Sequence, residues 1–409
     1  MKDSDQKIKK EDSEYEKKIS QDFSVDEYMF AEAMEYRNMW IRRIILIISV
    51  ILTCVLAIVV FKVDKKGSDN QQNQGLSNDY LVISMKNKDG VLVSQAITKY
   101  LKNDLLNEKN ADVIPSDFLT QGERLDGQIS VGINLSTKKA IALCYKIELA
   151  DNPDFNQARV DYVYADGLYE FKHLYANMEY FYRVTVYAKS GVDSETGAFT
   201  TSDTPRFLSI DGLYNVRDIG NWMTDTGKRI KQGLLIRGVE LDGAVERAYH
   251  LTNTGLKDML DILGIKTDMD LRTEKTEMMD ALGSRVDHKY YDMVMYEDIF
   301  TEVGKAEIRD VFADLANPSN YPIYLHCTYG VDRTGTVCYL LEALLGVSAE
   351  DCLKEYGLSN MKITNIKLIE NGLKEYDGNT LKEQTESYLL SCGITEDQIQ
   401  SIRNIFLGE

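Results

Sequence analysis

A cysteine and an arginine with five residues between them are the side chains of this chain best suited to chemistry. They are Cys327 and Arg333, within the stretch "HCTYGVDRTG". As a thiolate, the cysteine could attack a phosphorus atom. The planar guanidinium of the arginine could hold two phosphate oxygens at once. A pair with this spacing arises by chance in roughly one such chain in four, so the residues around the pair must support the assignment.

The elements predicted on either side of the pair make it more specific. "YPIYLH" (Tyr321–His326) predicts a short apolar strand, and "RTGTVCYLLEALLG" (Arg333–Gly346) has the apolar spacing of a helix that ends at glycine. A loop between them can curl until its N–H groups point inward around an anion, at the positive end of the helix. The predicted phosphate-binding residues are Thr328, Tyr329, Gly330, Val331, Asp332 and Arg333.

Three residues in or beside the loop have predicted supporting roles. Gly330 allows a backbone angle or a close approach that a side chain would block. Thr334 could hydrogen-bond the thiolate and help it to leave when the phosphorylated cysteine is hydrolysed. His326 is expected to buttress the loop by hydrogen bonding and not to act as a base. The simpler alternative, a buried structural cysteine beside a surface arginine, is disfavoured by the strand–loop–helix setting.

In this setting the loop resembles that of cysteine-dependent tyrosine phosphatases, in particular the bacterial family with the signature His-Cys-x-x-Gly-Lys-Asp-Arg-Thr-Gly. The similarity extends over about residues 207–409 and includes "GLYNVRDIGNW" (Gly212–Trp222) and "DLRTEKTE" (Asp270–Glu277). The resemblance implies hydrolysis of phosphomonoesters through a cysteinyl-phosphate, with no metal and no cofactor. Val331 replaces the signature lysine, which favours phosphotyrosine over multiply phosphorylated lipids. Within Gly212–Trp222, which we call the entry motif, Asn221 replaces the second glycine of the family's pattern.

The general acid is not fixed by the resemblance. Ordinary tyrosine phosphatases use an aspartate in a Trp-Pro-Asp loop, but the two tryptophans here, Trp40 and Trp222, form no such motif. Asp332, inside the loop, is the favoured acid, followed by Asp298 and then Asp292, both upstream of the cysteine. Four other charged residues are expected to form scaffold ion pairs or loop supports: Arg217, Asp218, Arg237 and Arg272.

The predicted fold class is α/β, with a tyrosine phosphatase-like parallel sheet flanked by helices in residues 205–409. An all-β region precedes it, because residues from about 128 to 202 alternate as short strands do. The step from Leu174 to Tyr180 resembles the tyrosine corner of fibronectin type III-like sandwiches. We therefore predict such a sandwich within residues 80–204, acting as a spacer without chemistry of its own.

Residues 41–63 are predicted to form one transmembrane helix. From Ile44 to Phe61 the chain carries no charge, and that length spans about 27 Å of hydrocarbon. A buried core helix and a cleaved signal peptide are the alternatives, and both fit less well. Read as a signal anchor, the helix places a tail of residues 1–40 in the cytoplasm, and residues 64–79 form a linker. The catalytic domain would then be extracytoplasmic, on a single-pass protein of the cell membrane.

Composition narrows the possible partners. The 409 residues carry a formal net charge of −18, which argues against nucleic acid as a partner. Six cysteines and four scattered histidines support neither a disulfide scaffold nor a structural zinc site. The expected partners are a phosphorylated protein or a small phosphomonoester, and the lipid bilayer; the oligomeric state stays open. Two alternative functions are a catalytically weak phosphate-binding adaptor and a phosphoinositide phosphatase.

Overall fold

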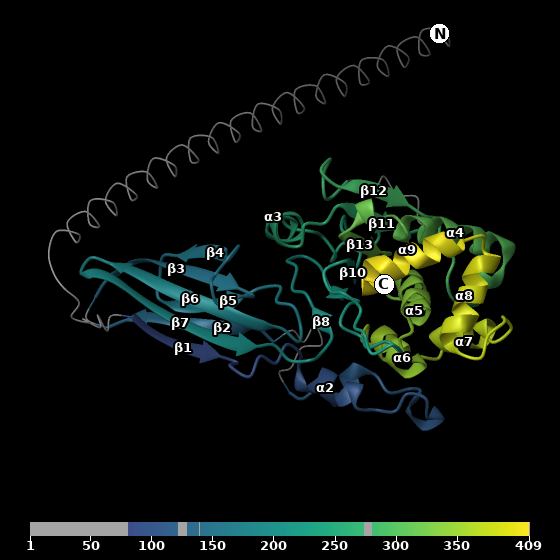
Figure 1. Cartoon of the computed structure of the whole chain (residues 1–409), viewed down its shortest axis with the longest axis horizontal. Coiled ribbons are helices and arrows are strands. Elements are labelled where there is room, and N and C mark those ends of the chain that lie inside the picture. Colours follow the sequence, from purple (N-terminus) through teal and green to yellow (C-terminus); the bar gives the residue numbers. More distant parts are fainter. Residues whose placement is uncertain (1–80, 122–128, 139, 274–279, 409) are drawn as a thin grey trace, which may run out of the picture. The chain divides into compact units, whose positions relative to one another are not determined.

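The computed structural model describes residues 81–121, 129–138, 140–273 and 280–408. All of the elements below belong to one compact unit, Ser77–Glu409 (Figure 1). The predicted tail (1–40), transmembrane helix (41–63) and linker (64–79) lie outside the described residues. Within the described ranges, no helix is both long enough and apolar enough to cross a membrane.

The all-β region consists of two antiparallel sheets that share one hydrophobic core. The first has the order β1-β2-β5, with β1 at Leu81–Lys86, β2 at Val131–Thr137 and β5 at Gly167–Phe171. The second has the order β4-β3-β6-β7, with β4 at Arg159–Val163, β3 at Ala142–Ala150, β6 at Glu179–Ala188 and β7 at Gly191–Thr200. The strands predicted from alternation are thus confirmed.

Strand β6 shows why these residues form a sheet. Tyr180, Tyr182, Val184 and Val186 are buried and alternate with residues that are only partly buried, as a strand with one core face requires. At the start of the strand, the Tyr180 hydroxyl accepts a hydrogen bond of 2.8 Å from the backbone N–H of Tyr175. This hydrogen bond joins the start of β6 to the segment that precedes it.

The connection between β1 and β2 leaves the sandwich and packs against the second domain. It contains α2 (Gln95–Leu101), capped by Ser94, and the short 3₁₀ helices Glu108–Asn110 and Pro115–Phe118. The α-helix ends after two turns, where Lys102 caps it.

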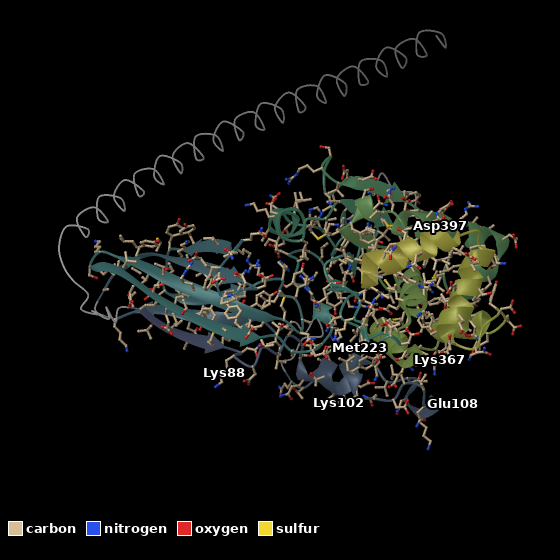
Figure 2. The ribbon with its side chains drawn as sticks, in the orientation of Figure 1. Lys88, Lys102, Glu108, Met223, Lys367 and Asp397 are labelled. Atoms are coloured by element: carbon tan, nitrogen blue, oxygen red, sulfur yellow. The ribbon has the colours of Figure 1, made fainter. Side chains whose placement is uncertain are left out.

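Tyr100 of α2 is fully buried in the main core of the second domain, and its hydroxyl donates to the Lys354 carbonyl at 3.4 Å. Lys367, on the same side of the molecule (Figure 2), donates to the Leu105 carbonyl at 3.4 Å. The inserted segment is therefore part of the second domain's packing.

The second domain is built on a six-stranded sheet with the order β12-β11-β13-β10-β9-β8. The four parallel strands are β12 (Asp287–Tyr290), β11 (Thr267–Asp270), β13 (Ile323–His326) and β10 (Leu235–Gly238). Two short antiparallel strands, β9 (Arg217–Asp218) and β8 (Arg206–Phe207), complete one edge. The predicted α/β fold with a parallel-containing sheet is confirmed, and the antiparallel edge was not foreseen.

Helices cover both faces of this sheet. One face carries α4 (Glu302–Leu315), α5 (Asp332–Leu345), α6 (Ala349–Gly357), α7 (Ile366–Leu373), α8 (Leu381–Ser391) and α9 (Glu396–Leu407). The other carries α3 (Asn253–Lys257) and the π-helical turn Asp258–Ile262. Successive residues of β13 pack into different hydrophobic cores on the two faces of the sheet. Leu325 packs on the face covered by α5, and Tyr324 packs on the face covered by α3.

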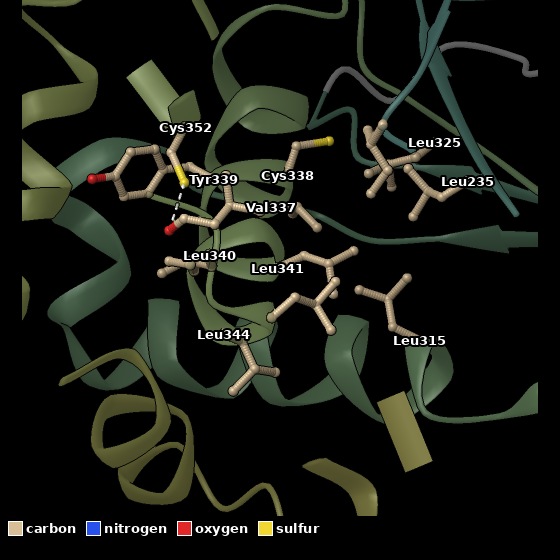
Figure 3. Close-up of a cluster of buried hydrophobic side chains, with 14 of the residues drawn as sticks. Leu235, Leu315, Leu325, Val337, Cys338, Tyr339, Leu340, Leu341, Leu344 and Cys352 are labelled. Atoms are coloured by element: carbon tan, nitrogen blue, oxygen red, sulfur yellow. Dashed lines mark hydrogen bonds between the residues drawn. The ribbon is translucent and has the colours of Figure 1, made fainter. Parts of the chain in front are cut away.

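Helix α5 is buried on every side from Arg333 to Leu345, as expected for a helix without a polar face. Figure 3 shows Val337, Cys338 and Leu341 turned toward Leu235 and Leu325 of the sheet, with Tyr339 on the opposite side. The helix ends at Gly346, which adopts the left-handed conformation (φ 87°). The start of α5 is therefore held rigidly relative to the strand ends.

Candidate active site

The loop that carries Cys327 lies where three parallel strands end side by side. In register, His326 at the end of β13 pairs with Gly238 of β10 and with Asp270 of β11. The residues that follow these strands must therefore meet at one edge of the sheet, which is where open α/β sheets bind ligands. Cys327 follows β13 directly, and its side chain is almost fully buried.

The carbonyl groups of the loop are held by donors from outside it. The backbone N–H of Glu240 donates to the Thr328 carbonyl at 3.1 Å. The side-chain amide of Asn215 donates to the carbonyls of Tyr329 and Gly330, at 3.2 Å each. Because the C=O and N–H of a peptide unit point in opposite directions, anchoring the carbonyls outward turns the intervening N–H groups inward. N–H groups arranged in this way are suited to binding an anion.

Gly330 fits this loop because no other residue could replace it without strain. Its φ is +65°, and a Cβ there would lie 2.1 Å from the carbonyl oxygen of Gly238. The Gly330 carbonyl also accepts a hydrogen bond of 2.7 Å from Arg237. The predicted close approach at this glycine is therefore an approach to strand β10.

A buried cluster of two arginines and a glutamate supports the loop from below. Glu355 of α6 contacts both guanidinium groups, Arg217 Nε at 2.6 Å and Arg237 Nη1 at 2.6 Å. All three side chains are at most 2% exposed. Burial opposes ionisation of Glu355, but the two arginines outweigh it and lower its pKa. Arg217 in turn donates to the Asn215 side-chain oxygen at 2.6 Å, so the cluster fixes the amide that holds the loop.

Arg333 lies in the first turn of α5 and is held by the segment after β11. Its guanidinium donates to the Thr273 hydroxyl at 3.2 Å, with the Leu271 carbonyl at 3.5 Å. Arg272 anchors that segment through ion pairs to Glu240, Asp242 and Asp270, at 2.6, 2.9 and 2.7 Å respectively. These contacts hold the Arg333 guanidinium against the segment after β11, and the ion pairs of Arg272 fix that segment in place.

His326 is buried behind the loop. Its Nδ1 lies 3.2 Å from the Cys327 carbonyl, and its Nε2 lies 3.0 Å from Asp268 Oδ1. Burial opposes protonation, but the charges of Asp268 and Asp270 outweigh it and raise the His326 pKa to about 9. At neutral pH the ring is therefore protonated, donates to the loop, and has no lone pair with which to act as a base.

Asp268 also contacts a second histidine, His288 of β12, at 2.9 Å. Two hydroxyls beside the cysteine, those of Thr328 and Thr334, are buried and have no hydrogen-bond partner among the described residues. The loss of one hydrogen bond for a buried hydroxyl is costly. Both groups are therefore suited to bind a ligand or the cysteine sulfur.

The three candidate acids occupy different settings. Asp332 is the half-buried first residue of α5, and its carboxylate accepts a hydrogen bond from the Tyr296 hydroxyl. Asp292 and Asp298 are exposed. Asp298 belongs to the 3₁₀ turn Tyr296–Phe300, whose first residue is the one that contacts Asp332. Of the three, Asp332 is thus the carboxylate that forms part of the loop itself.

Asn221 explains how the entry motif tolerates the loss of its second glycine. The residue has φ 77°, a left-handed conformation that asparagine accepts more readily than most residues do. Its side-chain amide donates to Asp203 at 3.0 Å and to the Thr204 carbonyl at 3.1 Å. The substitution therefore preserves the turn and adds a link to the segment between the two domains.

The sequence comparisons agree with this geometry. Residues 208–406 match the tyrosine phosphatase family. A protein of Cupriavidus necator, provisionally named a tyrosine-protein phosphatase, is 28% identical over 184 residues, covering 38% of this chain and 63% of the relative. A tyrosine-protein phosphatase of Nostoc commune is 29% identical over 126 residues, covering 25% of this chain and 43% of the relative. The chain thus spans less than two thirds of each of these relatives.

Two solved structures were also found to be similar to part of this chain. The core catalytic domain of the PP-IP phosphatase SIW14 from S. cerevisiae, in complex with citrate, is 16% identical, with 42% of this chain and 89% of that chain covered and a TM-score of 0.27. A second structure of the Siw14 catalytic core is 16% identical, with 39% and 92% covered and a TM-score of 0.28.

The remaining cysteines within the described ranges are free and buried: Cys144, Cys338, Cys352 and Cys392. Burial raises the pKa of Cys338 to about 12, so this thiol stays protonated at neutral pH. The described residues contain no group of three or more His, Cys, Asp or Glu side chains that could hold a metal ion.

Several residues that shape the site were not predicted from the sequence. Asn215 and Arg217 belong to the quoted entry motif, yet only the arginine was singled out. Glu355 lies in an ordinary amphipathic helix, and nothing in its neighbours indicates a buried ion pair. Tyr296 lies between the two aspartates that were considered as acids. The entry-motif asparagine is the one residue that the family signature could have identified.

Glu342 of α5 is fully buried, and neither carboxylate oxygen has a hydrogen-bond partner among the described residues. Burial raises its pKa well above the ordinary value, and nearby Glu355 adds to the effect. A raised folded-state pKa contributes stability that is complete below the unfolded pKa, about 4.3, and is lost as pH rises toward the folded pKa.

Glu342→Gln is therefore expected to be more stable than wild type at pH 7, with the gain vanishing near pH 4. Urea unfolding at several pH values measures the difference. Exposed Glu375→Gln is the control and should show no such trend. A gain that does not depend on pH would contradict a protonated Glu342.

Proposed function

We propose that this protein is a protein-tyrosine phosphatase that hydrolyses phosphomonoesters through a cysteinyl-phosphate. The observation that carries the proposal is the loop of residues 328–331, whose carbonyls are anchored by Glu240, Asn215 and Arg237. Its inward N–H groups form a cradle between Cys327 and the start of α5. Such preorganised donors stabilise charge that develops in a transition state without reorganising.

The proposed reaction has two steps. The Cys327 thiolate attacks phosphorus while Asp332 gives a proton to the departing oxygen, so that an S–P bond replaces the P–O ester bond. A water molecule then attacks phosphorus, its proton passes to the Asp332 carboxylate, and inorganic phosphate leaves with the thiolate restored. Arg333 and the loop N–H groups hold the equatorial oxygens throughout. Thr334 assists the departure of the sulfur.

The substrate is proposed to be a monophosphate ester, with phosphotyrosine favoured and phosphoserine or phosphothreonine possible. Val331 supports this choice because it is half-buried against the main core and supplies no charge for a second phosphate. A lysine at the same position would offer such a charge. The names of the two tyrosine-protein phosphatase relatives point the same way.

We further propose that residues 41–63 anchor the protein in the cell membrane, with the phosphatase-family domain on the extracytoplasmic side. The uncharged stretch from Ile44 to Phe61 supports this. The sandwich is proposed to be fibronectin type III-like, on the basis of its three-stranded and four-stranded sheets and the Tyr180 corner. Protease accessibility on intact cells tests the orientation, since a cytoplasmic domain would be protected.

Turnover of 4-nitrophenyl phosphate by the full chain in detergent tests the activity. Wild type should hydrolyse it, and Cys327→Ser should abolish turnover while still binding phosphate. Equal rates in the two proteins would refute the cysteinyl-phosphate mechanism. Phosphate binding by wild type without any turnover would instead identify an adaptor. A preference for phosphoinositide headgroups over phosphotyrosine peptides would overturn the proposed substrate class.

A further inference from the structure

We infer that Tyr296 is a positioning residue for the general acid: its hydroxyl fixes the Asp332 carboxyl so that the proton is delivered to the leaving oxygen. This inference rests on the proposed phosphatase activity and deepens it. It assigns a role to a residue that no sequence pattern singled out, and it implies that the chain is adapted to leaving groups that need a proton, as the phenol of tyrosine does.

Three side chains from different elements form the arrangement. The Tyr296 hydroxyl contacts Asp332 Oδ1, and it lies 2.7 Å from the hydroxyl of Tyr356 on α6. Tyr296 has one proton to donate and an ionised carboxylate can only accept. The proton order is therefore fixed: Tyr356 donates to Tyr296, and Tyr296 donates to Asp332. Two hydroxyls in series are thus committed to one carboxylate oxygen.

The backbone of Tyr296 is held in an unusual conformation to achieve this. Its φ is +54°, which is a genuine outlier for a bulky residue and costs of order 1–3 kcal/mol. Its N–H donates to the Thr336 hydroxyl of α5 at 3.3 Å. In the same turn Ile299 is fully buried, and its carbonyl accepts from Tyr388 at 2.8 Å. The surrounding structure thus maintains the strained residue directly beside the first turn of α5.

Holding Oδ1 determines where the proton must be. With that oxygen occupied by the Tyr296 donor, the transferable proton resides on Oδ2. In the first step it passes to the ester oxygen as the S–P bond forms and the P–O bond breaks. In the second step Oδ2 takes a proton from the attacking water. Without the Tyr296 hydroxyl, the carboxyl can rotate about χ2, which has a broad distribution for aspartate. The proton on Oδ2 is then no longer held in line with the leaving oxygen.

The loss should depend on the leaving group. The phenol of tyrosine has a pKa near 10, so its oxygen departs slowly unless it is protonated. A nitro group stabilises the departing 4-nitrophenolate, which needs less help. A residue that only supported the fold would reduce turnover of both substrates alike.

The test compares a phosphotyrosine peptide with 4-nitrophenyl phosphate, using the full chain in detergent. For Tyr296→Phe we expect kcat to fall about 10- to 100-fold with the peptide but only about threefold with 4-nitrophenyl phosphate, with KM changed less than kcat in both cases. Asp332→Asn should show the same selectivity, and adding Tyr296→Phe to it should cause little further loss. Tyr356→Phe should produce a weaker version of the pattern.

Tyr291→Phe is the matched control. Its hydroxyl donates to a different carboxylate, Asp314 Oδ2, at 2.6 Å, so the variant removes an equivalent hydrogen bond outside the proposed relay. Equal losses with both substrates, or no loss with the peptide, would overturn the role of Tyr296. Failure of wild type to hydrolyse 4-nitrophenyl phosphate would instead overturn the proposed function, so the two failures are distinguishable.

Discussion

Glu355→Gln is expected to lower the free energy of unfolding by about 3–5 kcal/mol and to abolish most of the activity. The carboxylate of Glu355 is the shared partner of Arg217 and Arg237, and both arginines are fully buried. Removing its charge leaves two buried cations poorly compensated. Because Arg237 also donates to the Gly330 carbonyl, the loop of residues 328–331 should lose its shape when the domain loses stability.

Urea unfolding and turnover of 4-nitrophenyl phosphate measure the two effects. Glu350→Gln, in the same helix, is the control: its ion pair with Lys354 spans one turn and is partly exposed, so the change should cost less than about 1 kcal/mol. A cost that small for Glu355→Gln would contradict the central role of the buried cluster.

A double variant that includes the neighbouring Glu342 tests the buried cluster more stringently. Its pKa is raised in part by Glu355, so in Glu355→Gln the Glu342 carboxyl should ionise more easily and partly offset the lost charge. The double variant Glu342→Gln, Glu355→Gln removes that compensation. We therefore expect the double variant to be less stable than the two single changes predict by addition.

Ile97→Asp is expected to destabilise the second domain by about 4 kcal/mol or more, although Ile97 lies in the connection between two strands of the sandwich. The side chain is fully buried in the core shared with α4 to α9. An unpaired carboxylate there cannot be hydrated while the helix stays packed.

The change can be followed by the fluorescence of Trp222, which packs against the same core, in a Trp40→Phe background that removes the other tryptophan. Ile141→Asp is the control, because Ile141 is a sandwich residue that is 67% exposed and should tolerate the charge. If Ile97→Asp leaves the Trp222 transition unmoved, the inserted segment is not part of the domain's core.

The sequence predicted those elements whose signals are local. The apolar strand before Cys327 and the helix after it appear as β13 and α5, with the glycine stop at Gly346. The strands of the sandwich followed from alternation. The sequence pattern could not show which other element each of them packs against. Helix α2 is an example, because nothing in its residues shows that it packs on another domain.

The candidate site divides in the same way. The signature residues located the loop, the cysteine and the arginine, because the chemistry of Cys327 and Arg333 depends on their spacing along the chain. The residues around the loop come from four other parts of the chain and are placed by tertiary contacts: Asn215, Glu240, Glu355 and Tyr296. A buried glutamate between two arginines and an exposed glutamate on a helix look alike in sequence, since only the fold decides what surrounds them.

The inserted segment has a consequence for the order of events during biosynthesis. The contact between Tyr100 and Lys354 joins residues 254 positions apart. At synthesis rates of about 5–20 residues per second, the apolar face of α2 emerges roughly ten to fifty seconds before its binding surface exists. The sandwich strands can pair during that interval, whereas the helix inserted between them must wait. A nascent chain of this protein should therefore depend on a chaperone that shields this helix until the C-terminal domain is complete.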